Sequence, residues 1–307
     1  MRIIFLGTPD FAVASLQALV ENNFEVVAVV TAPDRPAGRG LQMQESAVKK
    51  YALQKQIPVL QPLKLKDPTF IDTLKAFKPD IQVVVAFRML PEQVWNLPPM
   101  GTINVHASLL PAYRGAAPIN WAIIHGEHTT GVTTFKLQHA IDTGDILLQS
   151  TVAISQTETA GSLHDKLMHC GAVLLVQTLH SLQKGILQPK AQITNNQAPH
   201  APKIHTETCK IDWNRPCRDV YNHIRGLSPY PAAFTQWHGK LLKILQAKPI
   251  IADHHHTPGE VECDYKKSLA FYTQDGYLLI EELQMEGKKR MKTEDFLKGY
   301  RPPKTVL

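Results

Sequence analysis

Residues Gly101 to Pro111 spell GTINVHASLLP, an extended run that stops abruptly. Side chains alternate between the two faces of a strand, so Asn104 and His106 share one face while apolar neighbours occupy the other. Ser108 and Pro111 then favour a turn or loop. Because open α/β sheets bind ligands at the carboxyl ends of their strands, this stretch predicts a polar pair where a substrate would bind.

Strand-like and helix-like patterns alternate around this stretch. Runs rich in β-branched residues cover 2–7, 25–30 and 80–86, with helical patterns at 10–20, 46–56 and 69–77. Further along we expect a helix at 118–125, strands at 131–137 and 146–154, and a long helix at 162–183. This alternation predicts an α/β domain over residues 1–188, with a Rossmann-like, doubly wound and mostly parallel sheet.

The C-terminal part of the chain differs in composition and in its hydrophobic pattern. Residues 189–203 have the proline-rich and asparagine-rich composition of a linker. Residues 204–307 contain one helical pattern at 216–225 and short alternating runs at 233–237, 241–247, 259–263, 269–273 and 277–283. Short strands closed by turns predict a smaller C-terminal β-barrel domain of the OB-like type.

The composition is that of an ordinary globular protein. Of 307 residues, 44% are hydrophobic and 20% are charged, enough for one large or two modest cores. The first strand is too short to be a signal peptide, and no apolar run approaches the roughly 20 residues of a membrane span, so we expect a cytoplasmic protein. The four scattered cysteines form no Cys-x-x-Cys pair, which predicts reduced thiols, and no metal is expected.

The net charge of +6 is unevenly distributed. Residues 1–188 contain 15 basic and 14 acidic side chains, whereas residues 189–307 contain 18 basic and 13 acidic ones. A basic C-terminal part indicates an anionic partner such as nucleic acid. A solvated, lysine-rich surface explains the same excess, and charge alone leaves both interpretations open.

Asp142, in the sequence Ile141-Asp-Thr-Gly144, completes a set of groups suited to acyl transfer. A carboxylate near His106 would orient the imidazole and stabilise its charged form, and the Asn104 carboxamide would donate to an oxyanion. No Gly-x-Ser-x-Gly elbow and no neighbouring cysteine supplies a nucleophile, so direct transfer to an amine is favoured over an acyl-enzyme. From spacing alone, a purely structural role for these residues remains an alternative.

The motif around these residues resembles that of the folate-dependent formyltransferases. The matching segments are Asn104-Val-His-Ala-Ser-Leu-Leu-Pro111, Tyr113 to Pro118 and Asp142-Thr-Gly-Asp145. The resemblance extends to Gly7–Phe11, Pro33–Gly40, Ile211–Trp213 and Ile224–Pro231, and so covers nearly the whole chain. It implies a catalytic first domain, a tRNA-binding second domain, 10-formyltetrahydrofolate as formyl donor, and methionine esterified to initiator tRNA as acceptor.

The same resemblance assigns roles to individual residues. It implies catalytic roles for Asn104, His106 and Asp142, and a folate-binding segment made of Ser108, Leu109, Leu110 and Pro111. It also implies that Arg35 and Arg39, in the loop 31–44, contact the acceptor arm of the tRNA. Many relatives carry lysines after the Arg-Gly pair of this loop, where this chain has Leu41-Gln42.

A second departure lies in Ala86-Phe-Arg-Met-Leu-Pro91, which is one residue shorter than the corresponding segment of many relatives. The resemblance implies that this segment lines the pterin pocket. Phe87 and Met89 would pack there on the folate rings or, alternatively, in the protein core. The run His254-His255-His256 could bind a metal adventitiously, but a solvated loop is the favoured interpretation because no partner cluster accompanies the run.

Three functions are therefore compared. The first is formylation of methionyl initiator tRNA, by a protein expected to be monomeric. The second is formylation of a small amine, such as a sugar nucleotide, which needs the same trio but no basic loop. The third is a noncatalytic RNA-binding module with the same fold, which the intact trio disfavours.

Overall fold

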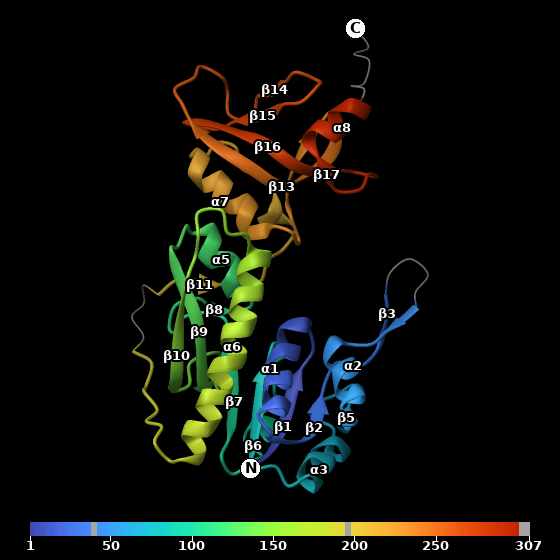
Figure 1. The fold of residues 1–307 in the computed structure, drawn as a ribbon, viewed down its shortest axis with the longest axis vertical. Helices are drawn as coiled ribbons and strands as arrows, with labels where there is room; N and C mark the ends of the chain where they lie inside the picture. The colour runs from blue at the N-terminus through green and yellow to red at the C-terminus, as the bar shows by residue number, and fades with distance from the viewer. Residues whose placement is uncertain (38–41, 194–197, 301–307) are drawn as a thin grey trace. The chain divides into compact units, whose positions relative to one another are not determined.

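The computed structural model describes residues 1–37, 42–193 and 198–300 (Figure 1). These residues form two compact units. Unit 1 consists of the described residues within 1–115, 129–153 and 164–200, and unit 2 of those within 116–128, 154–163 and 201–300. Each unit therefore combines three separate stretches of the chain.

Unit 1 is built on a seven-stranded sheet of order β10-β9-β7-β6-β1-β2-β5. Its strands are β1 (Arg2–Gly7), β2 (Glu25–Val30), β5 (Val59–Leu60), β6 (Ile81–Val85), β7 (Thr102–His106), β9 (Thr129–Lys136) and β10 (Ile146–Ala153). The five strands from β5 to β7 are parallel, whereas β9 and β10 are antiparallel to their neighbours. The predicted doubly wound, mostly parallel sheet is confirmed.

The central strands explain why the sequence pattern was so clear. Ile3, Ile4, Phe5 and Leu6 of β1 are all fully buried, as expected for a strand covered on both faces. The strand order runs from β1 to β2 on one side and from β1 to β6 on the other, so the direction of winding reverses between β1 and β6. Ligands of such sheets bind beside this reversal, at the carboxyl ends of the strands.

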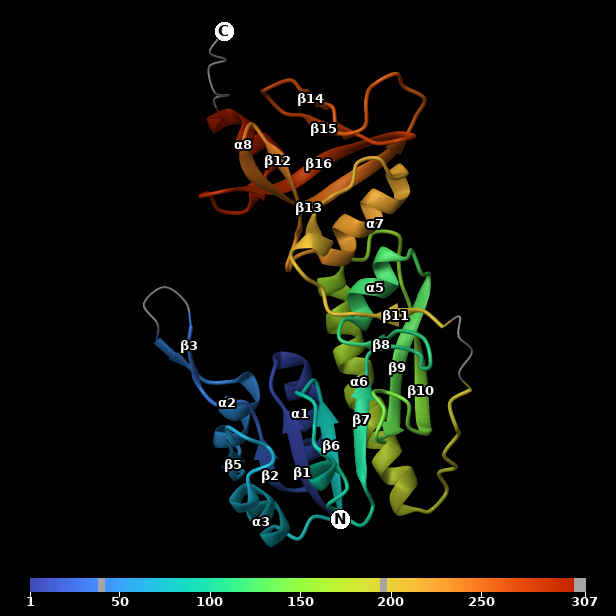
Figure 2. The ribbon, with the colours of Figure 1, turned by 180° about the vertical axis from the view of Figure 1, so that it is seen from behind.

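The longer helices of unit 1 follow the predicted patterns closely, whereas the short helix Glu92–Trp95 was not predicted. The helices are α1 (Asp10–Glu21), α2 (Ala47–Gln54), α3 (Pro68–Ala76), the short α4 (Glu92–Trp95) and most of α6 (Ala160–Gln183). Figure 1 shows α1 and α6 on the same face of the sheet, and the view from behind in Figure 2 has β7 and β9 in front of α6. Gly171 permits this packing, since a Cβ there would lie 3.1 Å from Val105 of β7.

The segment after β2 contains a hairpin where the sequence suggested only a loop. It pairs β3 (Arg35–Ala37) with β4 (Gln42–Gln44) in antiparallel register. Asp34 anchors its base through Lys49 at 2.5 Å and Gln61 at 2.8 Å. The Lys49 ammonium, followed by the Gln61 amide, lowers the pKa of Asp34. The hairpin projects away from the sheet (Figure 1).

Unit 2 contains an antiparallel half-barrel with the strand order β12-β13-β16-β15-β14. Its strands are β12 (Ala233–Trp237), β13 (Lys240–Ile251), β14 (Val261–Cys263), β15 (Leu269–Tyr272), β16 (Gly276–Met285) and β17 (Met291–Lys292), which pairs with β16. The helices are α5 (Pro118–Ile124), α7 (Cys217–Leu227), α8 (Thr293–Gly299) and a 3-10 turn, Glu207–Cys209. This sheet confirms the smaller C-terminal β domain.

Helix α5 is the part of unit 2 that comes from the middle of the chain. The Asn120 amide donates to the Gly226 carbonyl at 2.7 Å, and a Cβ on Gly226 would lie only 2.6 Å from Ile124. Ile124 also belongs to the same buried cluster as Ile224 and Leu227. The α5–α7 contact is therefore close-packed, and it depends on glycine at position 226.

Two short strands complete the described elements, β8 (Arg114–Gly115) and β11 (His200–Ala201).

The four cysteines are free, and burial raises the pKa of Cys209, Cys217 and Cys263. Across the described ranges, no helix has the length and apolar character needed to cross a membrane.

Candidate functional site

The predicted polar pair lies at the carboxyl end of β7. His106 is the last residue of this strand, and Asn104 precedes it by two residues. Neighbouring β6 ends in parallel register with β7, at Val85 opposite Val105. The pair therefore lies at the carboxyl edge of the parallel strands, one strand beyond the reversal between β1 and β6, and the fold predicts a ligand along this edge.

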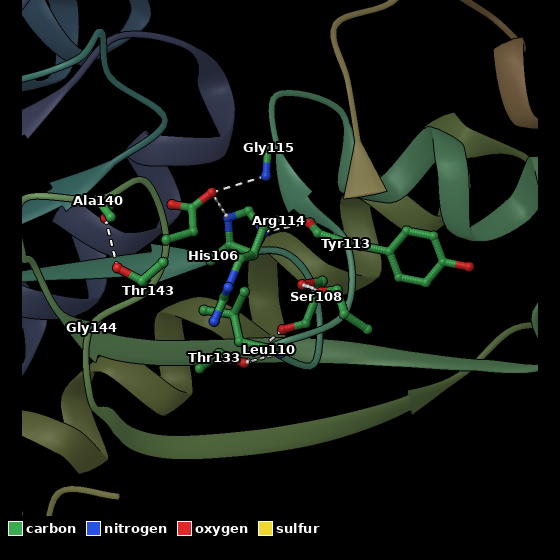
Figure 3. A network of polar contacts seen from close by, with 12 residues as sticks. His106, Ser108, Leu110, Tyr113, Arg114, Gly115, Thr133, Ala140, Thr143 and Gly144 are labelled. Atoms are coloured by element: carbon green, nitrogen blue, oxygen red, sulfur yellow. Dashed lines mark hydrogen bonds and ion pairs between the residues drawn. The ribbon is translucent and has the colours of Figure 1, made fainter. Parts of the chain in front are cut away.

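The His106 ring is held by groups on both of its nitrogens (Figure 3). Nε2 lies 2.9 Å from the Tyr113 carbonyl oxygen, and Nδ1 lies 3.8 Å from Oδ2 of Asp142. A carbonyl oxygen only accepts, so Nε2 carries the hydrogen of that bond. Both His106 and Asp142 are more than 90% buried. The structure thus brings His106 and Asp142 together as the motif suggested.

Asp142 reaches His106 from a tight loop that follows β9. Its Oδ2 accepts a hydrogen bond from the Gly115 amide at 3.0 Å, and its backbone has a φ of +53°. Gly144 makes the loop possible, because a Cβ there would lie 1.6 Å from the Lys136 carbonyl oxygen. The Asp-Thr-Gly sequence is explained by this geometry: aspartate tolerates a left-handed backbone, and only glycine fits against β9.

Among the residues that the structure describes, the Asn104 carboxamide is the group of the trio without a hydrogen-bond partner. Its side chain is half-buried. Over the described part of the chain, no hydrogen bond occupies its amide or its carbonyl. An amide held in place by its strand but not engaged by protein is suited to donate to a ligand.

The segment from Ser108 to Pro111 is fixed by hydrogen bonds to the antiparallel edge of the sheet. Thr133 of β9 donates to the Ser108 carbonyl at 2.7 Å and accepts from the Leu110 amide at 3.1 Å. Gln149 of β10 donates to the Leu110 carbonyl at 3.0 Å. The Leu110–Pro111 peptide bond is cis. Thr133 and Gln149 had no signal in the sequence beyond their places in predicted strands.

The two apolar residues expected near the folate occupy different environments. Phe87 is half-buried and packs against the core cluster that contains Ile4 and Leu6, whereas Met89 is 74% exposed. Between them, the Arg88 guanidinium donates to the carbonyl oxygens of residues 62 and 63. Burial, followed by the positive charge of Arg35, lowers the pKa of Arg88.

The basic loop is described only in part. Arg35 is exposed at the start of β3. Arg39 and Leu41 lie outside the described residues, and the side chain of Gln42 is not described.

The histidine run lies in unit 2, where His256 hydrogen-bonds Glu260 at 2.8 Å and stacks on Tyr272. The described ranges contain no group of three or more histidine, cysteine or acidic side chains arranged to hold a metal ion.

Sequence comparison matches both parts of the chain to formyl transferase domains. The formyl transferase family model matches residues 1–179, and the model for the formyl transferase C-terminal domain matches residues 203–301. The methionyl-tRNA formyltransferase of Bacteroides fragilis is 49% identical over 309 residues, which cover 98% of this chain and 95% of that protein.

Comparison with solved structures supports the fold. The structure of Aquifex aeolicus HypX in complex with tetrahydrofolic acid matches with a TM-score of 0.67 and 20% identity, over 99% of this chain and 48% of HypX. The Helicobacter canadensis N-formyltransferase in complex with folinic acid and dTDP-3-aminofucose matches with a TM-score of 0.65 and 19% identity, over 94% of this chain and 99% of that protein. At this level of identity, the matches establish the shared architecture.

Proposed function

The chain belongs to the formyl transferase family, and from this membership we propose that it transfers the formyl group of 10-formyltetrahydrofolate to the amino group of methionyl initiator tRNA. The product is formyl-methionyl-tRNA, which is used in translation initiation. The near full-length relationship to a methionyl-tRNA formyltransferase supports this acceptor over a small amine. We further propose that the protein acts in the cytoplasm as a monomer.

The observation that carries the proposal is the convergence of three side chains at the end of β7. Asn104 offers an unengaged amide, and His106 lies within 3.8 Å of the Asp142 carboxylate. A neutral donor, a base and an orienting carboxylate are the groups required for acyl transfer to an amine. The shared fold with folate-bound proteins is consistent with a folate donor.

In the proposed reaction, the methionyl nitrogen attacks the formyl carbon while the formyl oxygen becomes an oxyanion. Asn104 donates an N–H to this oxyanion, a contribution of about 10² to 10³-fold for a single donor. The new carbon–nitrogen bond is then kept, and the bond between the formyl carbon and the folate nitrogen breaks. Ser108 to Pro111 would position the folate, with Phe87 and Met89 beside its ring system.

His106 is proposed to handle the proton that the attacking amine loses. Since Nε2 donates to Tyr113, the lone pair that accepts this proton is on Nδ1, which faces Asp142. The carboxylate, directly or through a water, stabilises the imidazolium, and the positive ring also stabilises the oxyanion. The proton then passes to the folate nitrogen as it leaves, so no proton is gained or lost overall.

The proposed tRNA contacts lie outside this trio. Arg35 and Arg39 would bind acceptor-arm phosphates, and residues 204–307 would supply a further basic surface. Phosphate contacts position a nucleic acid without reading its bases, so these groups account for tRNA binding rather than for the choice of initiator tRNA.

A formylation assay tests the proposal. The protein is incubated with 10-formyltetrahydrofolate and with methionyl initiator tRNA, methionyl elongator tRNA or small amines such as an amino sugar nucleotide. Formylation of the initiator tRNA is the expected result. Formylation of only the small amines would contradict the proposed acceptor, and formylation of none would favour a noncatalytic RNA-binding module.

Catalytic variants make the same assay specific to the trio. Asn104→Ala and His106→Ala should each lower kcat about 100-fold or more. The matched control is His255→Ala, since His255 is exposed and far along the chain from this site. Near-normal turnover of either trio variant would contradict the mechanism.

A further inference from the structure

Gln192 lies in a segment whose composition is that of a linker, yet its side chain is half-buried against the loop that carries Asp142. We propose that Gln192 is a positioning residue, which joins the Asp142 loop to the Arg114 loop and so holds the carboxylate beside His106. This inference rests on the proposed formyl transfer and concerns how its site is assembled.

The Gln192 carboxamide uses all of its hydrogen-bonding capacity on these two loops. Its Nε2 donates to the Asp142 carbonyl at 2.9 Å and to the Gly144 carbonyl at 2.7 Å. Its Oε1 accepts from Nε and Nη2 of Arg114, at 3.2 and 2.6 Å. The partners determine the orientation of the amide, because carbonyls only accept and a guanidinium only donates.

The two loops joined by Gln192 are the ones that contact the imidazole. Arg114 stands between Tyr113, whose carbonyl accepts from His106, and Gly115, whose amide donates to Asp142. One side chain therefore connects the backbone segments on both sides of the His106 ring. No other described side chain bonds to both Arg114 and the Asp142–Gly144 backbone.

The Asp142 backbone gives a reason for such a support. Its φ of +53° lies in the left-handed region, which costs an L-residue on the order of 1 kcal/mol. A loop with such an unfavourable backbone conformation needs contacts with other parts of the protein to stay in one conformation. The bonds from Gln192 to the carbonyls of Asp142 and Gly144 are such contacts.

The backbone on either side of Gln192 is hydrogen-bonded to other parts of unit 1. Lys190 and Ile146 exchange two backbone hydrogen bonds of 2.8 Å, just after the Asp142 loop. The Pro199 carbonyl accepts from the Tyr113 amide at 2.6 Å, just before Arg114. The segment thus contacts one loop at its start and the other at its end, and Gln192 bonds to both.

Two substitutions distinguish the contact of Gln192 with Arg114 from its contacts with the Asp142 loop. Gln192→Glu keeps one oxygen as the acceptor for Arg114 but places the second carboxylate oxygen against the carbonyls of Asp142 and Gly144, whereas Gln192→Ala removes every contact. We expect both to lower kcat at least 10-fold, since a 1 Å misplacement of a catalytic group can cost about 100-fold. KM for each substrate should change less than 3-fold. Gln188→Ala and Gln188→Glu are the matched controls, because Gln188 is exposed and lies four residues before Gln192 in the chain.

A double-mutant cycle tests whether Gln192 acts through Asp142. In an Asp142→Asn background, Gln192→Ala should lower kcat by less than 2-fold, since the carboxylate that it positions is already absent. The inference is overturned if Gln192→Ala keeps kcat within 2-fold of wild type, or if its effect is as large in the Asp142→Asn background. A wild-type protein that formylates no methionyl-tRNA would instead contradict the proposed function.

Discussion

Replacing Gly144 by alanine is expected to lower the rate of formyl transfer about 100-fold without unfolding the protein. A Cβ at this position would lie 1.6 Å from the Lys136 carbonyl oxygen, whereas real Cβ atoms stay at least 3.0 Å from such atoms. The two atoms must therefore separate by a further 1.4 Å, the difference between these distances. The φ of Gly144 is not in the left-handed region, so the effect is steric alone.

The loop, rather than the strand, is expected to move. Lys136 ends β9, which is hydrogen-bonded to β7 on one side and β10 on the other. A shift of 1.4 Å at Gly144 is transmitted to Asp142 two residues earlier, and a misplacement of about 1 Å can cost about 100-fold in rate. Overpacking of this kind also lowers the free energy of unfolding by about 1 to 3 kcal/mol.

The assay is the initial rate of methionyl-tRNA formylation at saturating substrates, with Tm measured on the same preparations. Gly299→Ala is the control, because a Cβ there meets no atom within 4 Å. It should keep wild-type kcat and Tm. A folded Gly144→Ala protein that retains more than a third of wild-type kcat would refute the steric argument.

Three further predictions concern other parts of the molecule. Burial, followed by the charge of Arg215, lowers the pKa of His223 to about 4. Between pH 6.5 and 4 this histidine therefore binds more protons in the unfolded state than in the folded state, so the free energy of unfolding falls as the pH falls. Urea unfolding should show a loss of about 2 to 3 kcal/mol over this window, and His223→Gln should remove most of it; an unchanged pH slope would exclude this histidine. Thr133→Val should raise KM for the formyl donor and lower stability by about 1 to 3 kcal/mol, because it leaves the Ser108 carbonyl and the Leu110 amide unpaired; a wild-type KM would argue against this support of the loop. Arg35→Ala should reduce the slope of log affinity for tRNA against log salt by up to about 0.9 in a filter-binding titration, and an unchanged slope would move the phosphate contacts elsewhere.

The sequence predicted what local patterns encode. The β-branched runs of β1 and β6 indicated buried parallel strands, and the period of two placed Asn104 and His106 on one face of β7. The turn residues after His106 located the end of this strand. Composition and periodicity report the environment of a whole element, so these features needed no long-range information.

The remaining features of the site depend on contacts between distant residues. The Tyr113 carbonyl that holds His106 is a backbone atom, which has no residue-specific signal. Gln192 lies in a segment of low apolar periodicity, and such a pattern says nothing about the hydrogen bonds of one amide. The strand β3 has only three residues and contains Pro36, so its pairing with β4 was invisible to a propensity argument.

The interleaved path of the chain limits how this protein can be taken apart or recombined. Unit 2 is completed by residues 116–128 and 154–163, and Asn120 bonds to Gly226 across 106 positions of sequence. A fragment that starts in the linker would leave α7 without α5, and its apolar side chains would face water. Residues 204–307 therefore cannot be exchanged between relatives on their own. A chimera must also carry the matching α5, which is encoded in the N-terminal part of the gene.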